Sequence, residues 1–523
     1  MKSQTSIGPC LSHSSSSMEI SKWIVDLPSM EGWSGPAASS KTFELMGSHD
    51  DQGKSLILRA ERTSGSKQEA LVTFSLGLSA PADESTTLWV SNPFSISGNV
   101  MEETVVPLLV QLLEEIINRA PNNSSVPLFK LTTDLSDTFL SYPAESLYHF
   151  LDFVFTCRFF WLCLCNAPSE IGSLFFQKFS SKLVASSCKQ ILKAFLTSIG
   201  ADFELKFTRS LSYIYTKLLI LRSFDVKSKE PNLGIYSSSY ASASHDFLVF
   251  KGYVPLLAMN QEWTNENKQG LLLDTAESVL RYTLAHQQLE AVAQFEYSVH
   301  RTENYLKVDF KVDNIRINVS QLRFNGSELL CDEKHFPSRV CITLGPELGS
   351  SYVVSTSLGR STPNHEKEIK AQKTIKGNFV KTKLPILKTT ARTATRRRVK
   401  SWTVDQAAEG DTATLDMILC DNSSGVEVAA WRPGANTQVD LRNSFRKRYA
   451  GANRALGKAG GVVFAGDEYG EQVSWRLKKE AEGRELQWKV GFRVWLTYIP
   501  NDCKTSYLET RCVQWEEEFS FTV

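Results

Sequence analysis

The chain has 523 residues, of which 42% are hydrophobic and 22% are charged, and its formal net charge is +1. This apolar share is typical of a globular protein, and the length predicts two or three domains. The near-zero net charge excludes a global field that would attract nucleic acid or an anionic membrane, so any such binding must be local.

The cysteines and the first residues bear on the compartment. The ten cysteines are irregularly spaced and include no Cys-x-x-Cys pair, which predicts reduced, mostly buried thiols. Residues 1–17 are Ser-rich and lack an apolar signal segment, so we expect a disordered tail, with a short transit peptide as the alternative. We therefore expect a cytoplasmic or nuclear protein, with the plastid as the alternative.

Residues 18–120 predict an N-terminal α/β region. Short apolar runs at 55–60, 70–78 and 87–90 predict strands, the first two paired as a hairpin. Residues 101–120 predict a helix, because their apolar residues recur at helical spacing and two glutamates lie in the first turn.

Residues 121–230 predict a helical or poorly packed insertion. The run 153–165 is dense in Phe, Cys and Leu, and its uncharged part is shorter than the roughly 20 apolar residues that cross a bilayer. A buried helix is favoured over a membrane span. Because the run shows no polar face, we also hypothesise that part of 150–190 is a gene-model artefact or a locally unpacked insertion. Further helices are predicted at 182–199 and 205–221.

Residues 231–360 predict an antiparallel β region. Period-two alternation or short apolar runs indicate strands, and one helix is predicted at 270–289; the strands are expected at 247–257, 291–299, 305–312, 340–344 and 352–358. Residues 361–400 predict a basic linker opposed only by Glu366 and Glu368, which self-repulsion should keep extended or disordered.

Residues 401–523 predict a C-terminal β-rich domain with its own aromatic core. Six of the eleven tryptophans lie here, and the segments 486–498 and 513–523 alternate apolar and polar residues. Residues 412–419 and 425–431 predict a strand pair. The fold class is α+β, predominantly antiparallel β, with helical segments in the N-terminal half.

Three blocks of this C-terminal third carry a resemblance. They are Ser401–Asp411, Phe445–Asn453 and Gly461–Gly470. With these motifs the chain resembles a family of uncharacterised plant proteins. The resemblance implies a plant source and no activity.

No catalytic, cofactor-binding or metal-binding motif is found. The glycines of 457–461 lack the Ser or Thr that follows a P-loop lysine, so they predict a turn that enters a strand. The adjacent Asp467 and Glu468 are expected to be solvated carboxylates of a turn. No histidine lies between 366 and 523, which excludes a Ser-His-Asp triad within the C-terminal domain alone.

Two basic clusters are candidate anion-binding sites. The first has no acid, and a solvated loop is the competing explanation for it; its bases are Arg442, Arg446, Lys447, Arg448, Arg454 and Lys458. The second is a candidate nuclear-import or nucleic-acid run made of Arg396, Arg397, Arg398 and Lys400.

The sequence favours a non-catalytic interaction or scaffold protein with an unknown protein partner and no cofactor. The first alternative is binding of an anionic ligand, nucleic acid or phospholipid, through 366–400 and 442–458. The second is an enzyme whose site is assembled across domains from distant carboxylates and a histidine; the candidates are His149, His245, His286 and His300.

Overall fold

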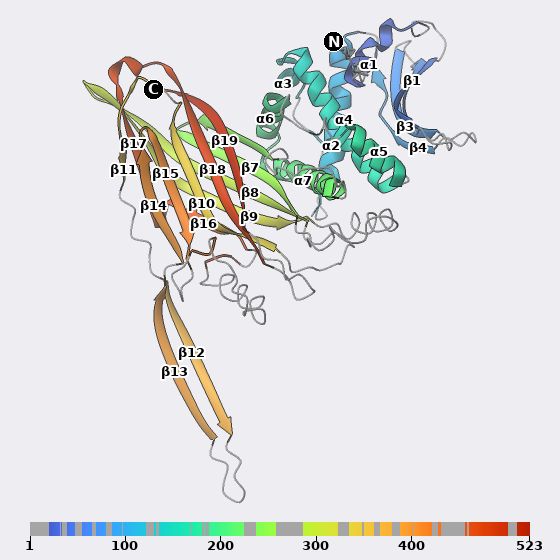
Figure 1. Cartoon of the computed structure of the whole chain (residues 1–523). Coiled ribbons are helices and arrows are strands. Elements are labelled where there is room, and N and C mark those ends of the chain that lie inside the picture. The colour runs from blue at the N-terminus through green and yellow to red at the C-terminus, as the bar shows by residue number, and fades with distance from the viewer. Residues whose placement is uncertain are drawn as a thin grey trace, which may run out of the picture. The chain divides into compact units, whose positions relative to one another are not determined.

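The structure is a computed structural model, and it describes the residues that build the helices and strands. These are residues 20–31, 33, 39–47, 55–64, 70–79, 86–96, 98–121, 130–131, 135–167, 169–179, 183, 188–223, 237–257, 286–322, 334–347, 350–359, 367–378, 388–399, 401–420, 427–429, 455–457, 460–499 and 510–523. The chain divides into two compact units, 1–119 with 125–207 and 120–124 with 208–523 (Figure 1).

The first unit contains an antiparallel sheet in the strand order β1-β2-β3-β4, with β5 also paired to β3. The predicted strands of this region are confirmed. The bounds are β1 (Ser39–Gly47), β2 (Ser55–Ser64), β3 (Ala70–Ser79), β4 (Thr86–Val90) and β5 (Phe94–Ser95).

Helices make up the rest of this unit. The predicted helix at 101–120 forms as a π-helical turn, η2 (Met101–Val105), which runs into α2 (Val106–Asn118). The others are α1 (Ile20–Asp26) with the short η1 (Leu27–Ser29), α3 (Ser136–Leu140), α4 (Ala144–Asn166), α5 (Ser169–Phe179), α6 (Lys189–Ser198) and α7 (Ala201–Ser223), which continues into the second unit.

Helix α4 is the central helix of the first unit. It contains the Phe- and Cys-rich run, and every residue from 151 to 163 is buried. It contacts α1, α2, α3, α5, α6 and β4. The run lacks a polar face because it has no exposed side, so residues 151–163 form the favoured buried helix and are not locally unpacked. In the part of the chain that the structure describes, no helix is long and apolar enough to cross a membrane.

The second unit is built mainly from two antiparallel sheets. One has the order β11-β17-β9-β8-β7-β6, with β16 also paired to β9. Its strands are β6 (Ser238–Ser244), β7 (Phe247–Leu257), β8 (His286–Arg301), β9 (Tyr305–Gln321), β11 (Val353–Leu358), β16 (Val462–Ala465) and β17 (Gln472–Lys478).

The other sheet has the order β14-β15-β10-β18-β19. Its strands are β10 (Lys334–Pro346), β14 (Trp402–Glu409), β15 (Thr412–Leu419), β18 (Glu485–Ile499) and β19 (Thr510–Thr522). The short helices α10 (Gly466–Tyr469) and η7 (Lys479–Ala481) flank β17.

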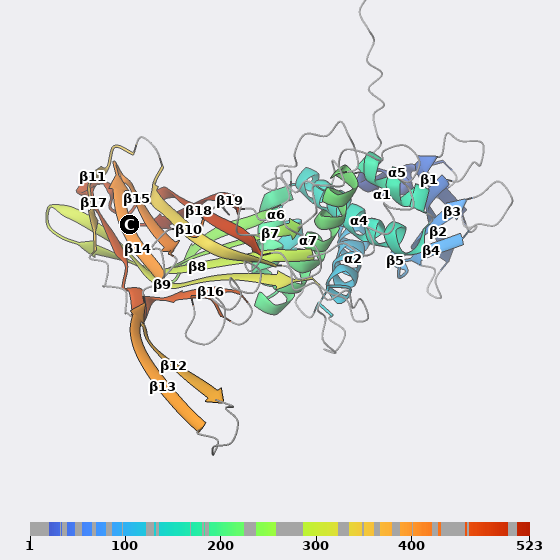
Figure 2. The same cartoon turned by 60° about the horizontal axis from the view of Figure 1, so that its bottom comes forward.

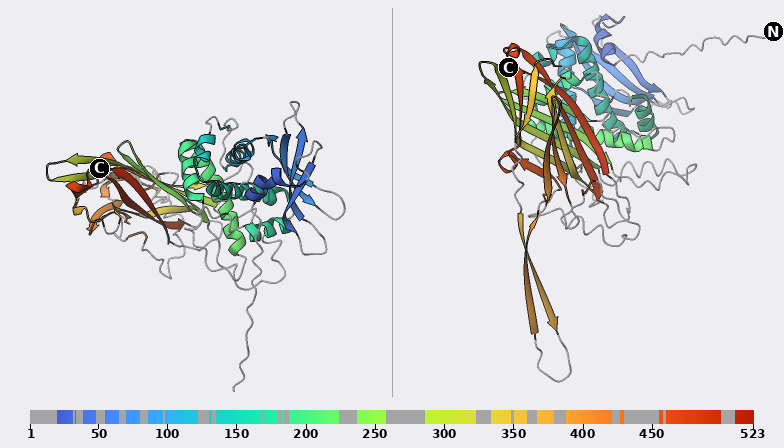
Figure 3. Two further views of the ribbon diagram at one scale, coloured as in Figure 1. Left: turned by 90° about the horizontal axis from the view of Figure 1, so that it is seen from above. Right: turned by 60° about the vertical axis from the view of Figure 1, so that its left-hand side comes forward.

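The two sheets lie face to face (Figure 3). They share one core that is rich in aromatic side chains. Phe250 of β7 stacks on Phe492 of β18 at a centroid distance of 4.9 Å. Trp475 of β17 meets Trp488 of β18 edge to face at 4.8 Å. The period-two alternation predicted for β9, β18 and β19 exists because one face of each strand enters this core.

The predicted boundary between 231–360 and 401–523 is corrected by the strand order. Strand β10 lies between β15 and β18, with Val340 opposite Met417 on one side and Val494 on the other. Segments on both sides of the predicted linker therefore form common sheets. Residues 401–523 contribute strands to both sheets and do not form a separate β domain.

Two smaller predictions in this region are also changed. The predicted helix at 270–289 is wrong at its end, because β8 begins at His286; residues 270–285 lie outside the described part. Of the predicted strand pair of 412–419 with 425–431, the described residues 427–429 show one bridge, Cys420 to Glu427, and β15 pairs with β14 and β10.

The predicted linker contains a regular hairpin. Strands β12 (Lys367–Asn378) and β13 (Lys388–Val399) pair antiparallel over twelve residues without a register shift. They form a two-stranded sheet of their own (Figures 1 and 2). Local self-repulsion did not prevent strand pairing here, so these residues are extended, as one of the two predicted alternatives had it, but they are paired and not disordered.

Candidate anion-binding site

The β12–β13 ribbon is the strongest concentration of positive charge in the described chain. Its 24 residues include nine Lys and Arg residues and one acid, Glu368, for a net charge of +8. Because the whole chain has a net charge of +1, all other residues together carry −7. The ribbon is therefore a local concentration of positive charge, which anion binding requires in a chain whose overall charge is nearly zero.

The register divides the ribbon positions into two faces of different composition. Residues that are opposite each other are either both even-numbered or both odd-numbered. Because successive positions of a strand alternate between its two faces, even-numbered positions share one face of the ribbon and odd-numbered positions share the other. The even face has six bases, one acid, two amides, two threonines and one alanine. Its bases are Lys370, Lys376, Lys388, Arg392, Arg396 and Arg398.

The odd face is only half as basic. It has three bases, three threonines and a glycine, and it holds nearly all the aliphatic residues of the ribbon: Ile369, Ala371, Ile375, Ala391 and Val399. Within the run Arg396, Arg397 and Arg398, strand alternation assigns the middle arginine to the odd face. Three neighbouring bases of the predicted nuclear-import run therefore do not form one patch, and Lys400 lies outside the described residues.

The ribbon is unfavourable when judged by its own energetics. Lys370 is directly opposite Arg396, and like charges in such positions destabilise strand pairing. An isolated two-stranded hairpin is at best marginally stable in water. A ribbon of this charge gains stability from any anion that neutralises it.

The six bases of the other predicted anion-binding cluster, from Arg442 to Lys458, all lie outside the described residues. The neighbouring glycines do form the predicted turn, since Gly457 N donates to Gly461 O at 2.8 Å and Gly460 N to Gly457 O at 2.9 Å. Strand β16 begins directly after this turn.

The geometry around His300 does not fit a catalytic triad. His300 Nε2 lies 3.1 Å from Ser298 Oγ and 3.3 Å from Asp309 Oδ2. A catalytic triad needs two different ring nitrogens for the nucleophile and the carboxylate, and here both face the same nitrogen. Among the described residues no three His, Cys, Asp or Glu side chains are grouped to hold a metal ion.

Asp309 is instead a structural carboxylate on the outer face of its sheet. Burial raises its pKa, but hydrogen bonds from Lys307, Ser474 and Gln472 outweigh this and the net pKa lies below its ordinary value of 3.8. The Lys307 Nζ to Asp309 Oδ1 distance is 2.8 Å. No pattern in the sequence predicted this cluster, because its members come from three strands, β8, β9 and β17.

Glu471, which directly precedes β17, has the most strongly raised pKa of the described acids in the sandwich. Its side chain is 1% exposed, and burial raises its pKa from 4.5 to about 7, against the lowering effect of a hydrogen bond donated by Gln406. Gln406 belongs to β14, so this bond joins the two sheets. The Oε1 atom has no hydrogen-bond partner among the described residues. No sequence signal marked this residue, which precedes an ordinary alternating strand.

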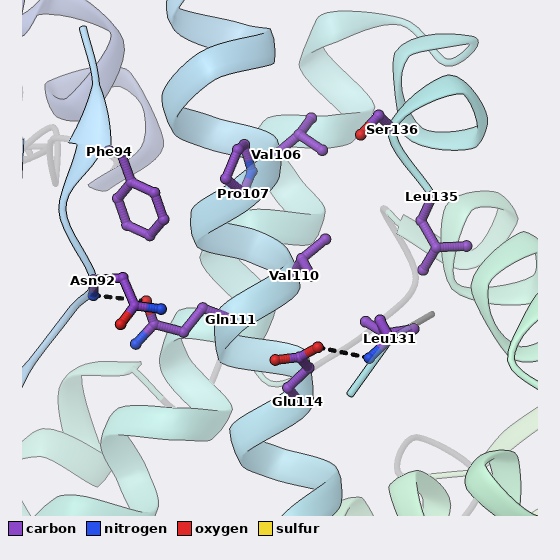
Figure 4. Close-up of a pocket in the computed structure, with 10 residues that line it drawn as sticks. All are labelled: Asn92, Phe94, Val106, Pro107, Val110, Gln111, Glu114, Leu131, Leu135 and Ser136. Atoms are coloured by element: carbon purple, nitrogen blue, oxygen red, sulfur yellow. Dashed lines mark hydrogen bonds between the residues drawn. The ribbon is translucent and has the colours of Figure 1, made fainter. Parts of the chain in front are cut away.

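A pocket of about 500 Å³ opens along α2 in the first unit (Figure 4). Gln111 accepts a hydrogen bond from the Asn92 backbone at 2.9 Å, and Glu114 accepts one from the Leu131 backbone at 2.6 Å. Its ten described lining residues include one carboxylate and no His or Cys, so they supply no acid/base pair. The full lining is Asn92, Phe94, Val106, Pro107, Val110, Gln111, Glu114, Leu131, Leu135 and Ser136.

Comparison with known proteins adds only distant structural neighbours. No protein-family model and no curated protein matches the chain. The membrane-inserted form of the Clostridium perfringens NetB toxin is 11% identical over 54% of this chain and 95% of its own, with a TM-score of 0.21. Clostridium perfringens delta-toxin (10%, 55% and 89%, TM-score 0.20) and a pore forming protein (10%, 55% and 90%, TM-score 0.19) are similar to the same extent. Likeness at this level supports no conclusion about the fold or activity of this chain.

Proposed function

We propose that the protein is a non-catalytic binding protein that holds phosphate-rich polyanions on its β12–β13 ribbon. The single observation that carries this proposal is the net charge of +8 on 24 residues of a two-stranded sheet in a chain of net charge +1. Lysine and arginine that neutralise phosphates release condensed counterions, which supplies affinity without a shaped pocket.

The energetics of the ribbon support the same function. Opposed bases such as Lys370 and Arg396 cost stability in the free protein, and a bound polyanion would remove that cost. Sites that break a local rule of stability are often functional sites. The remaining residues, with a net charge of −7, would repel a polyanion and so restrict it to the ribbon.

The test is the binding of inorganic polyphosphate to the full-length protein across a salt series. The double variant Lys370→Gln with Arg396→Gln should lower affinity on the order of tenfold and reduce the slope of log K against log salt by about 2. The matched control is Lys311→Gln with Arg316→Gln, which removes two exposed bases from β9 and should leave affinity within about twofold.

Two results would overturn the proposal. One is binding that does not change with salt, and the other is an equal loss of affinity in the ribbon variant and the β9 control. Removing like charges should stabilise the ribbon, so weaker binding in its variant would not be explained by unfolding.

Source and compartment also belong to this proposal. The resemblance of the C-terminal third supports a plant source, and the arginines of β13 support a cytoplasmic protein that can enter the nucleus. A fluorescent fusion imaged in plant cells tests this: replacing Arg396, Arg397 and Arg398 by glutamine should deplete any nuclear signal.

A further inference from the structure

We infer that the polyanion is double-stranded DNA, and that the even-numbered face of the β12–β13 ribbon enters its major groove. This inference rests on the proposed function and names its partner. It is carried by what each face of the ribbon contains, as the strand register assigns it.

The even face has the residue types that read DNA. Ten of its twelve positions hold a base, an amide or a hydroxyl; the non-basic ones among them are Gln372, Thr374, Asn378 and Thr390. Arginine and lysine pair with guanine and with phosphates, and glutamine and asparagine pair with adenine. Only Glu368 and Ala394 are of neither kind.

The dimensions of the ribbon agree with the groove. Twelve residues at about 3.4 Å each make each strand about 40 Å long. The major groove is about 12 Å wide and admits a two-stranded β-ribbon. The major groove of an RNA duplex is too deep and narrow for side chains to read, so DNA is preferred to RNA.

The composition also argues against two other anionic partners. The 24 strand residues include no Phe, Tyr or Trp, so they have no platform for the stacked bases of a single strand. A lipid surface would gain from aliphatic contact, but the aliphatic residues other than Ala394 are on the odd face, where only three of the nine bases lie.

The experiment measures fluorescence anisotropy of the full-length protein with DNA duplex, RNA duplex and single-stranded DNA, each of about 20 nucleotides or base pairs. Phosphatidylcholine vesicles with about one fifth phosphatidylserine are the lipid probe. We expect the DNA duplex to bind on the order of tenfold more tightly than either other nucleic acid, and the vesicles to bind more weakly still.

A matched pair of variants tests the face. Lys370→Gln with Arg396→Gln removes two opposed bases from the even face, and Lys373→Gln with Arg397→Gln removes two bases from the odd face of the same ribbon. The even-face variant should lose at least about fivefold more duplex affinity than the odd-face variant.

The outcomes separate this inference from the proposed function. Equal losses in both variants, equal affinity for single strands, or tighter binding to vesicles would overturn the DNA inference while salt-dependent polyphosphate binding still supported the proposed function. Failure of polyphosphate to bind the ribbon at all would overturn both.

Discussion

Replacing Glu471 by glutamine should remove a pH-dependent weakness of the β-sandwich. The carboxyl is buried, its Oε2 accepts a hydrogen bond from Gln406, and burial raises its pKa from 4.5 to about 7. A group whose folded pKa lies above its unfolded pKa stabilises the fold below the unfolded value. That stability is lost as pH rises through the folded value. Wild-type stability should therefore fall between about pH 5 and pH 8.

The pKa change sets the size of the effect. A shift from 4.5 to about 7 corresponds to about 3 kcal/mol at pH well above 7. Water that reaches the ionised carboxylate would reduce it, so we expect between about 1 and 3 kcal/mol. Glutamine keeps the oxygen that accepts from Gln406 and has no charge to desolvate. The Glu471→Gln variant should match the wild type near pH 5 and exceed its stability at pH 8 to 9.

Urea unfolding followed by tryptophan fluorescence at each pH measures this difference. Comparing the two proteins at each pH cancels the other titrating groups. Glu409→Gln, on the exposed end of β14, is the control and should leave the pH profile of the wild type unchanged. Parallel profiles for wild type and Glu471→Gln from pH 5 to pH 9 would refute the assignment of a buried, desolvated carboxyl.

Three further substitutions test the packing. Trp488→Ala should cost about 3–5 kcal/mol in urea unfolding, because the ring is fully buried between Trp475 and Phe310; a cost below about 1 kcal/mol would contradict the shared core. Asp309→Asn should cost about 1–2 kcal/mol at neutral pH, and because the carboxyl pKa is lowered, the difference should vanish as pH falls below 3.8; a constant difference would exclude the ion pair. Arg158→Met should cost about 3 kcal/mol in thermal unfolding because it removes the arginine that pairs with Glu115 at 2.5 Å and leaves that carboxylate only its hydrogen bonds from Trp89 and Gln111, and adding Glu115→Gln should restore part of it; no recovery in the double variant would contradict the pair.

The strands of the sandwich were predictable because each has one face in the core and one in water. Leu486, Trp488, Val490 and Phe492 alternate with polar residues for that reason, and β18 forms where the alternation is found. The α+β class and the concentration of helices in the N-terminal half are confirmed in the same way. The alternation of apolar and polar residues is a local signal, because each strand keeps it whichever strand it pairs with.

The partners of the strands were not predictable by the same means. The domain boundary predicted between 360 and 401 is wrong because β10 pairs with β15 and β18. These strands are far from β10 in the sequence, and local residue patterns do not indicate such long-range pairing. The Phe- and Cys-rich run of α4 is the buried helix that the sequence favoured, but a run buried on every side has no amphipathic stripe, so the sequence also allowed a non-native or unpacked segment. Glu471 is desolvated by elements that come together only in the fold.

In the ribbon, the basic composition was recognised from the sequence but the strand pairing was not predicted. The density of bases in 361–400 predicted an extended or disordered linker, since self-repulsion opposes compaction. Backbone pairing does not require a compact core, and twelve matched pairs form although Lys370 faces Arg396. The paired strands carry a net charge of +8, and this is the property on which the proposed function depends.

The overall charge decides how such a ribbon would act at a distance. The rest of the chain carries −7, so a polyanion far from the protein meets a nearly neutral molecule and gains no long-range attraction. Within a Debye length, about 10 Å at 0.1 M salt, the ribbon and the remaining chain are sensed separately. Binding should therefore depend on contact with the ribbon, and neutralising bases elsewhere, as in the β9 control, lowers an attraction that barely exists. A large loss of affinity in that control would mean that the protein attracts polyanions as a whole, and the local site would no longer be needed to explain binding.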